Sequence, residues 1–511
     1  MRKLSLIAAG IAMTMAGTAN ANLDSLVSVS IFFSGNSAPS NMLREHMVRD
    51  VCSQTNPINV YVDTATTGLN AAALPLLNHT TYWAVQCTAD ATAGAGLAGQ
   101  TMGIYKSDGG SSQGATNVAD ATAVPFLDAS PTTCADTGIN KAIQNGGGVT
   151  YHIYQCGNVT QNQIPDGGGS DVEPSKFVGQ LAGSSDFVDR GNLNIQSGPG
   201  LIFGPAVTKA LRNALQSAQG LTVGSETEAN MPSLPRTYVR SLTEGKIQLW
   251  NSFPVYGSTL NVPATFAGAD GTLGTGDDVT PAGSNATLKG YVHLCRRTKG
   301  SGTHAEHMIH YHRANCMNGA FAMPGQPGLS GGAPAVFEGG SAGNLGLCLD
   351  HLDKGDGYTG VTPVMAAGRA SFGIGYQGLE KNVDNSENWR YVKVDGYAPT
   401  LKNVFDGNYD QIYFSSFQNR TGQDYRVGPL RSNVSASEKT AIDAFFANDL
   451  QITGAIAADI NAGLVYTWGA SGYMIPSTAA PAAFSAANPL IRWAREDATG
   501  TPNSCQPLTK K

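Results

Sequence analysis

Residues 296–312, RRTKGSGTHAEHMIHYH, concentrate residue types that bind anions. The segment combines two arginines, a lysine, a Ser-Gly-Thr turn and four histidines. A guanidinium presents a planar fork of N–H donors to an oxyanion, and a turn that opens a helix adds hydroxyls and free backbone N–H groups. Thr303 and Glu306 have the spacing of a capping box, which predicts a helix capped by Thr303. The positive end of that helix predicts an anion site, although a plain helix cap with surface arginines is the alternative.

Two further stretches favour the anion site over the plain cap. SGNSAPSNM follows a predicted strand and opens a helix, with Pro39 suited to its first turn and Ser37 and Ser40 supplying hydroxyls. DGGSSQGATNV, residues 108–118, is a Gly/Ser loop before another helix, and it lacks the Gly-Lys-Ser/Thr of a P-loop. Helix N-termini that converge on one cleft can bind a dehydrated oxyanion without a large positive net charge.

The histidines of the opening segment also raise the question of a metal site. His304, His307 and His310 follow one another at i,i+3, whereas helical metal sites more often use i,i+4 pairs, and no H-E-x-x-H is present. We therefore predict no metal here and expect solvated or capping histidines. His304 lies nearest the turn and is a candidate anion contact in its protonated form.

A second place where a metal could bind is the loop ADGTLGTGDDV, residues 269–279. Asp270, Asp277 and Asp278 supply hard oxygen ligands of the kind that calcium prefers. The loop lacks the spacing of an EF-hand, so it is a weak calcium candidate and a plain acidic turn is favoured. No cofactor is expected. The chain contains no G-x-S-x-G and no Ser, His and Asp set in a recognisable context, so we predict a protein that is not an enzyme.

Alternating strand-like and helix-like segments position these residues and predict an α/β fold. LVSVSIFF (26–33) is β-rich and is followed by an amphipathic helix in SNMLREHMVRDVC. LIFGPAV (201–207) leads into the helical stretch TKALRNALQSAQG, and KGYVHLC (289–295) leads into the anion-binding turn. SFGIGYQ and WRYVKV are further strand candidates. SASEKTAIDAFFANDL is a helix that Ser435 or Ser437 can cap.

The N-terminal residues predict an exported protein, and the composition of the chain limits its partners. Residues 1–21 have the charged start, apolar run and small-residue cleavage site of a signal peptide, and no cysteine follows to make a lipid anchor. No later run is long and apolar enough to span a bilayer. Charged residues make up only 14% of the chain, and loss of Arg2 and Lys3 with the signal changes the formal charge from −6 to −8. Binding to nucleic acid through bulk charge is therefore not expected. The expected location is the periplasm or the exterior of the cell.

The eight cysteines of an exported chain are expected to form disulfides. No C-x-x-C pair is present, which argues against a zinc knuckle or a thioredoxin-like redox pair. Proximity in sequence favours the pairs Cys52–Cys87, Cys134–Cys156 and Cys295–Cys316, without deciding the pairing.

An ordered series of motifs over most of the mature chain resembles a known family. In chain order they are SGNSAPSNML, YKSDGGSSQGA, SDVEPSKF, FGPAVTKALRNALQ, LTEGKIQLWNS, RTKGSGT, FGIGYQGLE and YDQIYFSSF. This series resembles the type 2 periplasmic solute-binding proteins, and most of all the phosphate-binding proteins of ABC importers, as a divergent member. The resemblance implies two lobes, each a mixed sheet flanked by helices, joined by a two-strand hinge, with the anion held between the lobes. Phosphate or a similar oxyanion and an ABC permease are the implied partners.

The same resemblance implies roles for individual residues. Arg297 would clamp ligand oxygens, and Asp171 would accept a hydrogen bond from a protonated oxyanion. Pro39 occupies a contact position of the first loop but has no N–H, so Ser40 would donate there. The remaining hydroxyl and backbone donors implied by the resemblance are Ser112, with Ser111 as a further candidate, and Ser301, Gly302 and Thr303.

The chain departs from the family at one position of the RTKGSGT motif, which we call the signature turn, and in its length. Lys299 stands where the family usually has an acidic residue, which makes the turn more positive and leaves the identity of the oxyanion open. We predict that the first lobe comprises residues 22–205 plus 408–511, with a Gly/Ala/Thr-rich insertion at about 65–170. The second lobe would comprise 206–407, with a Gly/Asp-rich insertion at about 255–287. A surface structural or adhesion protein with an altered anion site is the alternative, and a phosphatase-like enzyme is a minor one.

Overall fold

A computed structural model of the chain describes most residues downstream of the predicted signal peptide. The described ranges are 27–64, 81–94, 96–129, 133–143, 148–157, 160–252, 254–317, 335–382, 385, 387–421, 435–449, 472–486, 488–498 and 500–511. The predicted signal peptide, residues 1–21, lies outside them. None of the described helices is long and apolar enough to cross a bilayer.

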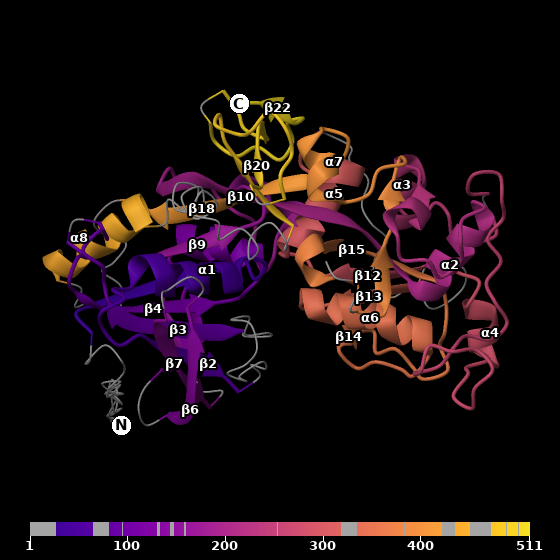
Figure 1. Cartoon of the computed structure of the whole chain (residues 1–511), viewed down its shortest axis with the longest axis horizontal. Coiled ribbons are helices and arrows are strands. Elements are labelled where there is room, and N and C mark those ends of the chain that lie inside the picture. The colour runs from indigo at the N-terminus through magenta and orange to yellow at the C-terminus, as the bar shows by residue number, and fades with distance from the viewer. Residues whose placement is uncertain are drawn as a thin grey trace, which may run out of the picture.

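The fold is α/β and has two lobes that lie side by side, joined by long strands (Figure 1). We call the lobe that contains β1 the first lobe and the lobe that contains β12 the second lobe. Elements of the first lobe are β1 (Val29–Ser34), α1 (Ser40–His46), a π-helical turn (Met47–Val51), β2 (Asn59–Asp63), β3 (Tyr82–Thr88), β4 (Thr101–Ser107), a second π-helical turn (Gln113–Asn117), β5 (Val124–Leu127), β6 (Cys134–Ala142), β7 (Thr150–Cys156), β8 (Thr160–Gln163), β9 (Gly167–Ser170) and α8 (Ala436–Ala444).

The second lobe has fewer strands and more helices. Its elements are α2 (Lys209–Ala218), β11 (Ser233–Leu234), α3 (Arg236–Thr243), α4 (Ser284–Leu288), β12 (His293–Arg297), α5 (Gly302–His312), β13 (Ala335–Gly339), α6 (Ala342–Lys354), β14 (Val361–Thr362), β15 (Gly373–Gly378), β16 (Trp389–Tyr391), β17 (Lys393–Val394) and α7 (Leu401–Phe405).

One mixed sheet runs through both lobes in the order β14-β13-β12-β15-β10-β18-β9-β1-β4-β3-β2-β7-β6. Two strands join the lobes, β10 (Leu193–Thr208) and β18 (Ile412–Arg420). The first part of β10 pairs with β18, and its last part pairs with β15 and β16 of the second lobe. A final segment adds β19 (Tyr473–Pro476), β20 (Leu490–Ile491), β21 (Trp493–Ala494) and β22 (Thr509–Lys510), of which β19 pairs with β10.

Local sequence explains the elements that lead to the predicted site. Every residue of β1 is buried, as expected of a central strand covered on both faces, and β1 pairs in parallel with β4 and β9. Because parallel strands end at the same edge of a sheet, the loops after β1, β4 and β9 lie near one another. In the second lobe, β12 lies parallel to β13 and β15 and places the RTKGSGT turn at the corresponding edge.

The range predicted as the first insertion is integral to the sheet. Strands β3 to β9 come from it, and β4 pairs with β1 along its whole length. The range of the second predicted insertion is mostly irregular and ends in the short helix α4. The exact lobe boundaries stay a prediction.

The disulfides confirm two of the three pairs that proximity favoured. Cys52–Cys87 and Cys134–Cys156 form, with sequence separations of 35 and 22. The predicted pair Cys295–Cys316 is wrong, because Cys295 of β12 bonds Cys348 of α6, which packs against that strand. Cys316 bonds Cys505, 189 residues away, a contact that only the tertiary fold creates.

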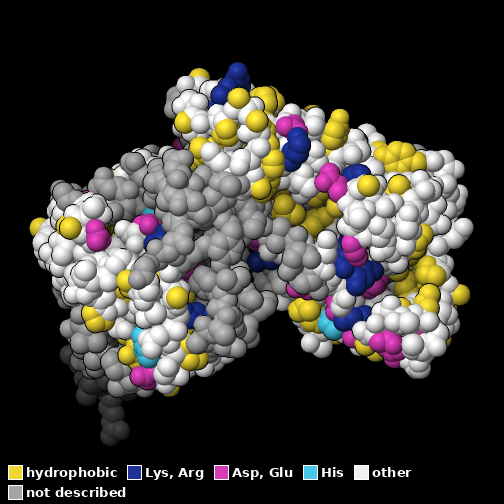
Figure 2. Space-filling view, viewed as in Figure 1, with side chains coloured by type: hydrophobic (Ala, Val, Ile, Leu, Met, Phe, Trp, Pro, Cys, Tyr) yellow, Lys and Arg dark blue, Asp and Glu magenta, His cyan; other side chains and the backbone are white. Residues whose placement is uncertain are grey.

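Most of the described surface on the face seen in Figure 2 is backbone or uncharged polar side chains. Charged side chains are scattered over it in small groups. This agrees with the low charged fraction of the sequence and with a binding site that does not depend on net charge.

Candidate functional site

The signature turn joins β12 to α5 and presents the N-terminus of that helix. Ser301 is the N-cap, and its Oγ accepts a hydrogen bond from the backbone N–H of His304 at 3.5 Å. The helix begins at Gly302, so the prediction that Thr303 is the cap is wrong, and Thr303 lies inside the first turn instead. Glu306, the predicted capping-box partner, is fully buried, and neither of its carboxylate oxygens has a hydrogen-bond partner in the described structure.

A polar cavity of about 220 Å³ lies beside this turn, between the two lobes. The first lobe contributes the loop and helical turn after β4, together with Ser184. The second lobe contributes the turn after β12 and Gly340, which follows β13. The lining residues are Gly110, Ser112, Gln113, Asn117, Ser184, Arg297, Thr298, Lys299, Gly300, Ser301 and Gly340. Arg297 and Lys299 are the charged residues of this lining, so the cavity is suited to an anion.

Glycine lets the two lobes touch at the edge of the cavity. The backbone N–H of Ser112 donates to the carbonyl oxygen of Gly300 at 2.9 Å, and the N–H of Gly300 donates to the carbonyl of Leu181 at 3.2 Å. Gly300 has φ of +80°, and a Cβ there would lie 2.4 Å from Ser112 Oγ and 2.7 Å from Gly183 Cα. A side chain at position 300 would therefore clash with the first lobe and strain the backbone.

Asp171 lies against the first turn of α5, next to the cavity rather than in its lining. Its Oδ2 accepts a hydrogen bond from Ser111 Oγ at 3.0 Å, and its backbone N–H donates to the same Oγ at 3.2 Å. A Cβ on Gly302 would lie 1.9 Å from Asp171 Oδ2. Burial raises the pKa of Asp171 to about 6, against the opposing effects of the Ser111 hydrogen bond and of nearby Arg297. A carboxyl with this pKa is mostly ionised at neutral pH and therefore acts as a hydrogen-bond acceptor there.

Arg297 is the cation that β12 delivers to the cavity. Its side chain is nearly buried, and its Nη2 donates to the carbonyl of Gly340 at 3.0 Å. Its Nε has no hydrogen-bond partner in the described structure. Burial lowers the pKa of Arg297 to about 10, and the negative charges of Asp171 and Glu380 oppose this change. The guanidinium therefore stays charged at neutral pH and keeps a donor for an oxyanion.

The structure brings together some of the predicted site residues and separates others. Ser112, Arg297 and Ser301 line the cavity, whereas Ser111, Asp171 and Gly302 form the layer beside it. Thr303 is buried in the first turn of α5. Pro39 and Ser40 at the start of α1 do not belong to the lining. Ser40 Oγ accepts from Trp83 Nε1 at 2.7 Å and also contacts Asp108, so its hydroxyl is already engaged. The resemblance placed that loop in the anion contact, and the cavity of this structure does not extend to it.

The histidines of α5 are not solvated, which corrects the expectation from sequence. His304, His307 and His312 are buried, and His310 bonds Tyr413 Oη and Arg236 Nη1, both at 2.9 Å. Burial lowers the pKa of His304 to about 3, so the protonated form that would contact an anion is disfavoured at neutral pH.

Several lining residues were missed by the sequence analysis. Gln113 and Asn117 supply carboxamides from the helical turn after the Gly/Ser loop, and Ser184 and Gly340 come from loops without a motif. The first two lie four residues apart on one turn, a spacing that could have indicated a shared face.

Behind the Gly/Ser loop lies a buried ion pair that was also missed. Lys106 Nζ lies 2.6 Å from Asp108 Oδ1, and burial lowers the pKa of Lys106. Lys106 and Asp108 lie two positions apart at the end of β4, a spacing that places both side chains on the same side of an extended chain. This spacing was the signal available in the sequence.

The acidic loop that we considered for calcium folds on itself. Asp270 N–H donates to Asp277 Oδ2 at 3.0 Å, and Gly274 N–H donates to Asp278 Oδ2 at 2.7 Å. Within the described ranges, no group of three or more His, Cys, Asp and Glu residues has an arrangement that could hold a metal ion. The carboxylates of this loop therefore stabilise a turn.

Solved structures similar to this chain include proteins of phosphate transport. One, from Clostridium perfringens, is described as a phosphate ABC transporter substrate-binding protein and was solved with bound phosphate; it is 13% identical, with a TM-score of 0.25, over 52% of this chain and 70% of its own. An ABC-type phosphate transport receptor from Vibrio cholerae is 10% identical, with a TM-score of 0.29, over 61% and 81%. PstS from Borrelia burgdorferi is 9% identical, with a TM-score of 0.26, over 64% and 88%.

No protein-family model and no curated protein sequence matches the chain.

Proposed function

We propose that this chain is an exported solute-binding protein that captures phosphate or a related oxyanion between its two lobes. One observation carries the proposal: Ser112 of the first lobe and Arg297 and Ser301 of the second lobe line the same polar cavity. A buried guanidinium with an unpaired Nε, together with hydroxyl groups and the N-terminus of an eleven-residue helix, is suited to a dehydrated oxyanion. The process is capture and release, without catalysis.

Asp171 supports phosphate over sulfate as the ligand. The negative charge of a carboxylate beside the cavity favours an anion that carries a proton, as monohydrogen phosphate does, over sulfate, which has no proton to donate at neutral pH. Ser111 holds this carboxyl in place. Lys299 adds a second positive charge to the lining and favours a divalent anion.

We further propose that the protein acts in the periplasm or outside the cell and delivers the anion to an ABC-type permease. The predicted signal peptide, the four disulfides and the motif series support this setting.

Equilibrium dialysis against radiolabelled phosphate tests the proposed function. We expect saturable binding that unlabelled phosphate and arsenate displace, and that sulfate displaces at least about 100-fold less well, a difference of roughly 3 kcal/mol. Competition by sulfate equal to that by phosphate would contradict the role of Asp171. Absence of binding to any of the three anions would favour the alternative, a surface structural or adhesion protein. Hydrolysis of a chromogenic phosphate ester would instead favour the phosphatase-like alternative.

A further inference from the structure

The C-terminal segment, which contains β19 to β22, lies across the junction of the two lobes, at the top of Figure 1. Its strand β19 pairs with β10, one of the two strands that join the lobes. Further along, Arg495 Nε donates to the carbonyl of Ile412 at 3.1 Å, and its guanidinium lies 5.1 Å from the centre of the Tyr413 ring. Both of those residues belong to β18, the other joining strand. The segment is therefore anchored on both strands of the hinge.

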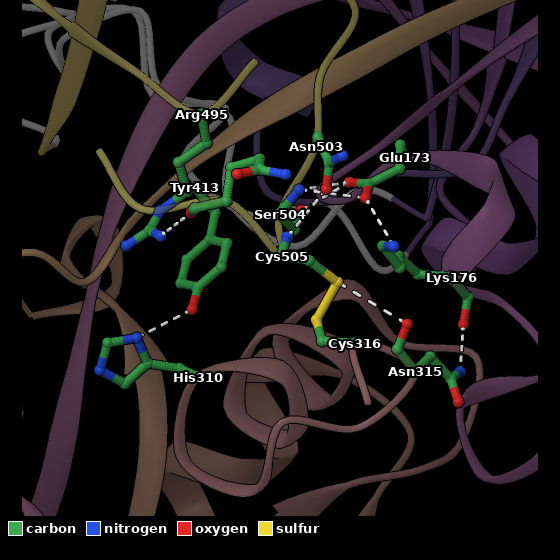
Figure 3. The surroundings of a disulfide bond; sticks show 11 residues. Glu173, Lys176, His310, Asn315, Cys316, Tyr413, Arg495, Asn503, Ser504 and Cys505 are labelled. Atoms are coloured by element: carbon green, nitrogen blue, oxygen red, sulfur yellow. Dashed lines mark hydrogen bonds and ion pairs between the residues drawn. A yellow bond between two sulfur atoms is a disulfide. The ribbon is translucent and has the colours of Figure 1, made fainter. Parts of the chain in front are cut away.

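A disulfide connects this segment to the second lobe. Cys505 bonds Cys316, which follows the C-terminal end of α5 (Figure 3). Helix α5 is the helix whose N-terminus lies at the cavity. The disulfide thus attaches the far end of the anion-binding helix to the C-terminal segment.

The neighbouring residue connects the same segment to the first lobe. Ser504 donates its backbone N–H to both carboxylate oxygens of Glu173 at 3.0 Å, and its Oγ donates to Oε2 at 2.6 Å (Figure 3). Lys176 Nζ lies 3.3 Å from the same carboxylate. Glu173 is buried and follows Asp171 by two residues, on the segment between β9 and β10. Ser504 and Cys505 therefore bridge the two lobes.

Direct contacts between the lobes accompany this bridge. Asn315 Nδ2 donates to the carbonyls of Lys176 at 2.8 Å and Val178 at 3.0 Å. Gly300 N–H donates to Leu181 at the edge of the cavity. Separation of the lobes would break these hydrogen bonds and move Cys316 away from Glu173, and the disulfide opposes that movement.

The four disulfides differ in their access to solvent. Both residues of Cys316–Cys505 are partly exposed, whereas both residues of Cys52–Cys87 and of Cys295–Cys348 are buried. In the fourth pair Cys134 is partly exposed and Cys156 is fully buried. Thiol–disulfide exchange requires a thiolate to reach a sulfur atom, so exposure favours reduction of the bond between the lobes before Cys52–Cys87 and Cys295–Cys348.

We propose that the Cys316–Cys505 disulfide is a reducible latch that holds the two lobes closed, and that a dithiol reductant opens it and speeds release of the anion. A thiolate of the dithiol attacks one sulfur and expels the other cysteine as a thiolate, and the second thiol of the reductant then displaces the first cysteine. The protein disulfide gains two electrons and, after protonation, becomes two thiols, while the dithiol becomes a disulfide. The effect on anion release rests on the function proposed above, whereas the effect on lobe separation does not.

The first experiment measures access and lobe separation without any anion. The full-length oxidised protein is treated with dithiothreitol at low concentration, alkylated, and analysed by mass spectrometry. We expect Cys316 and Cys505 to be labelled at least about 10-fold faster than the four buried cysteines, Cys52, Cys87, Cys295 and Cys348. Hydrogen exchange of the peptides that cover residues 176–184 and 298–302 should then rise about 3-fold or more, and exchange in β1 and β4 should not change. Equal labelling of all four pairs, or unchanged exchange at the junction, would overturn the latch.

The second experiment measures phosphate release from a double variant, Cys316→Ser with Cys505→Ser. A matched control, Cys134→Ser with Cys156→Ser, removes the disulfide that joins β6 to β7 at the far edge of the sheet. We expect phosphate dissociation at least about 10-fold faster in the first variant, corresponding to about 1.4 kcal/mol, and unchanged in the control. If both variants release phosphate at the rate of the wild-type protein, the latch does not control release. Reduction of the wild-type protein followed by reoxidation gives the same comparison without any substitution, should a variant fail to fold.

Discussion

The backbone N–H of Ser112 donates to the carbonyl oxygen of Gly300 at 2.9 Å and joins the Gly/Ser loop of the first lobe to the signature turn of the second. These two stretches are far apart in sequence, and each was identified as an anion-binding loop from its residue types. Their contact places Ser112, Arg297 and Ser301 around one cavity.

Arg297→Ala should weaken phosphate binding by about 10- to 100-fold, since a charge-assisted contact contributes roughly 1.5–3 kcal/mol. Arg296→Ala is the matched control, because it removes the same charge from the adjacent residue, which pairs with Glu338 outside the cavity lining. Calorimetry of both variants checks the prediction. Comparable losses of affinity in the two would show that charge in general, rather than the clamp, is responsible.

Gly302→Ala should disrupt the layer beside the cavity, because the new Cβ would lie 1.9 Å from Asp171 Oδ2 and 2.4 Å from Ser111 Oγ. We expect a loss of about 1–3 kcal/mol in the free energy of unfolding and at least about 10-fold weaker phosphate binding. In the control Gly340→Ala, also at the cavity, the Cβ meets no atom within 4 Å. Urea unfolding and calorimetry distinguish the two variants, and a Gly302→Ala protein as stable as wild type would refute the contact.

Lys299→Gln should reduce phosphate affinity about 3- to 10-fold and make binding less sensitive to salt, because one of the cavity's two positive charges is lost. Lys393→Gln, on β17 of the same lobe and outside the lining, should leave both quantities unchanged. Titrations at low and high ionic strength measure the difference. An unchanged salt dependence in Lys299→Gln would mean that this ammonium group does not act on the anion.

Asp171→Asn should change how stability depends on pH. Burial raises the folded-state pKa of Asp171 to about 6 from an ordinary value of 3.8. The folded protein therefore holds this proton more tightly than the unfolded chain, so the group's contribution to stability falls as pH rises from about 4 to about 6. Relative to wild type, the variant should gain about 1–3 kcal/mol in free energy of unfolding between pH 4 and pH 7.5. Urea unfolding at the two pH values measures this gain, and the same difference between the proteins at both would contradict the pKa change.

Local patterns predicted several elements, and the turn that joins β12 to α5, because short-range rules govern them. The apolar run before SGNSAP forms β1, and KGYVHLC contains the start of β12. Ser435 caps α8 as one of the two predicted candidates.

The features that depend on distant parts of the chain were predicted less well. No local pattern indicated that Cys316 would bond Cys505, or that Ser184 and Gly340 would join the cavity. The histidines of α5 were expected to be solvated or to cap the helix, because helical spacing alone does not show which faces of a helix are buried.

Calorimetric titration of the oxidised wild-type protein with phosphate tests the central claim most directly. Capture in the cavity between the lobes predicts one phosphate bound per chain, with a Kd of about 10 µM or tighter, and loss of the signal in Arg297→Ala. No heat with phosphate over several hours of equilibration, or heat that Arg297→Ala preserves, would contradict it.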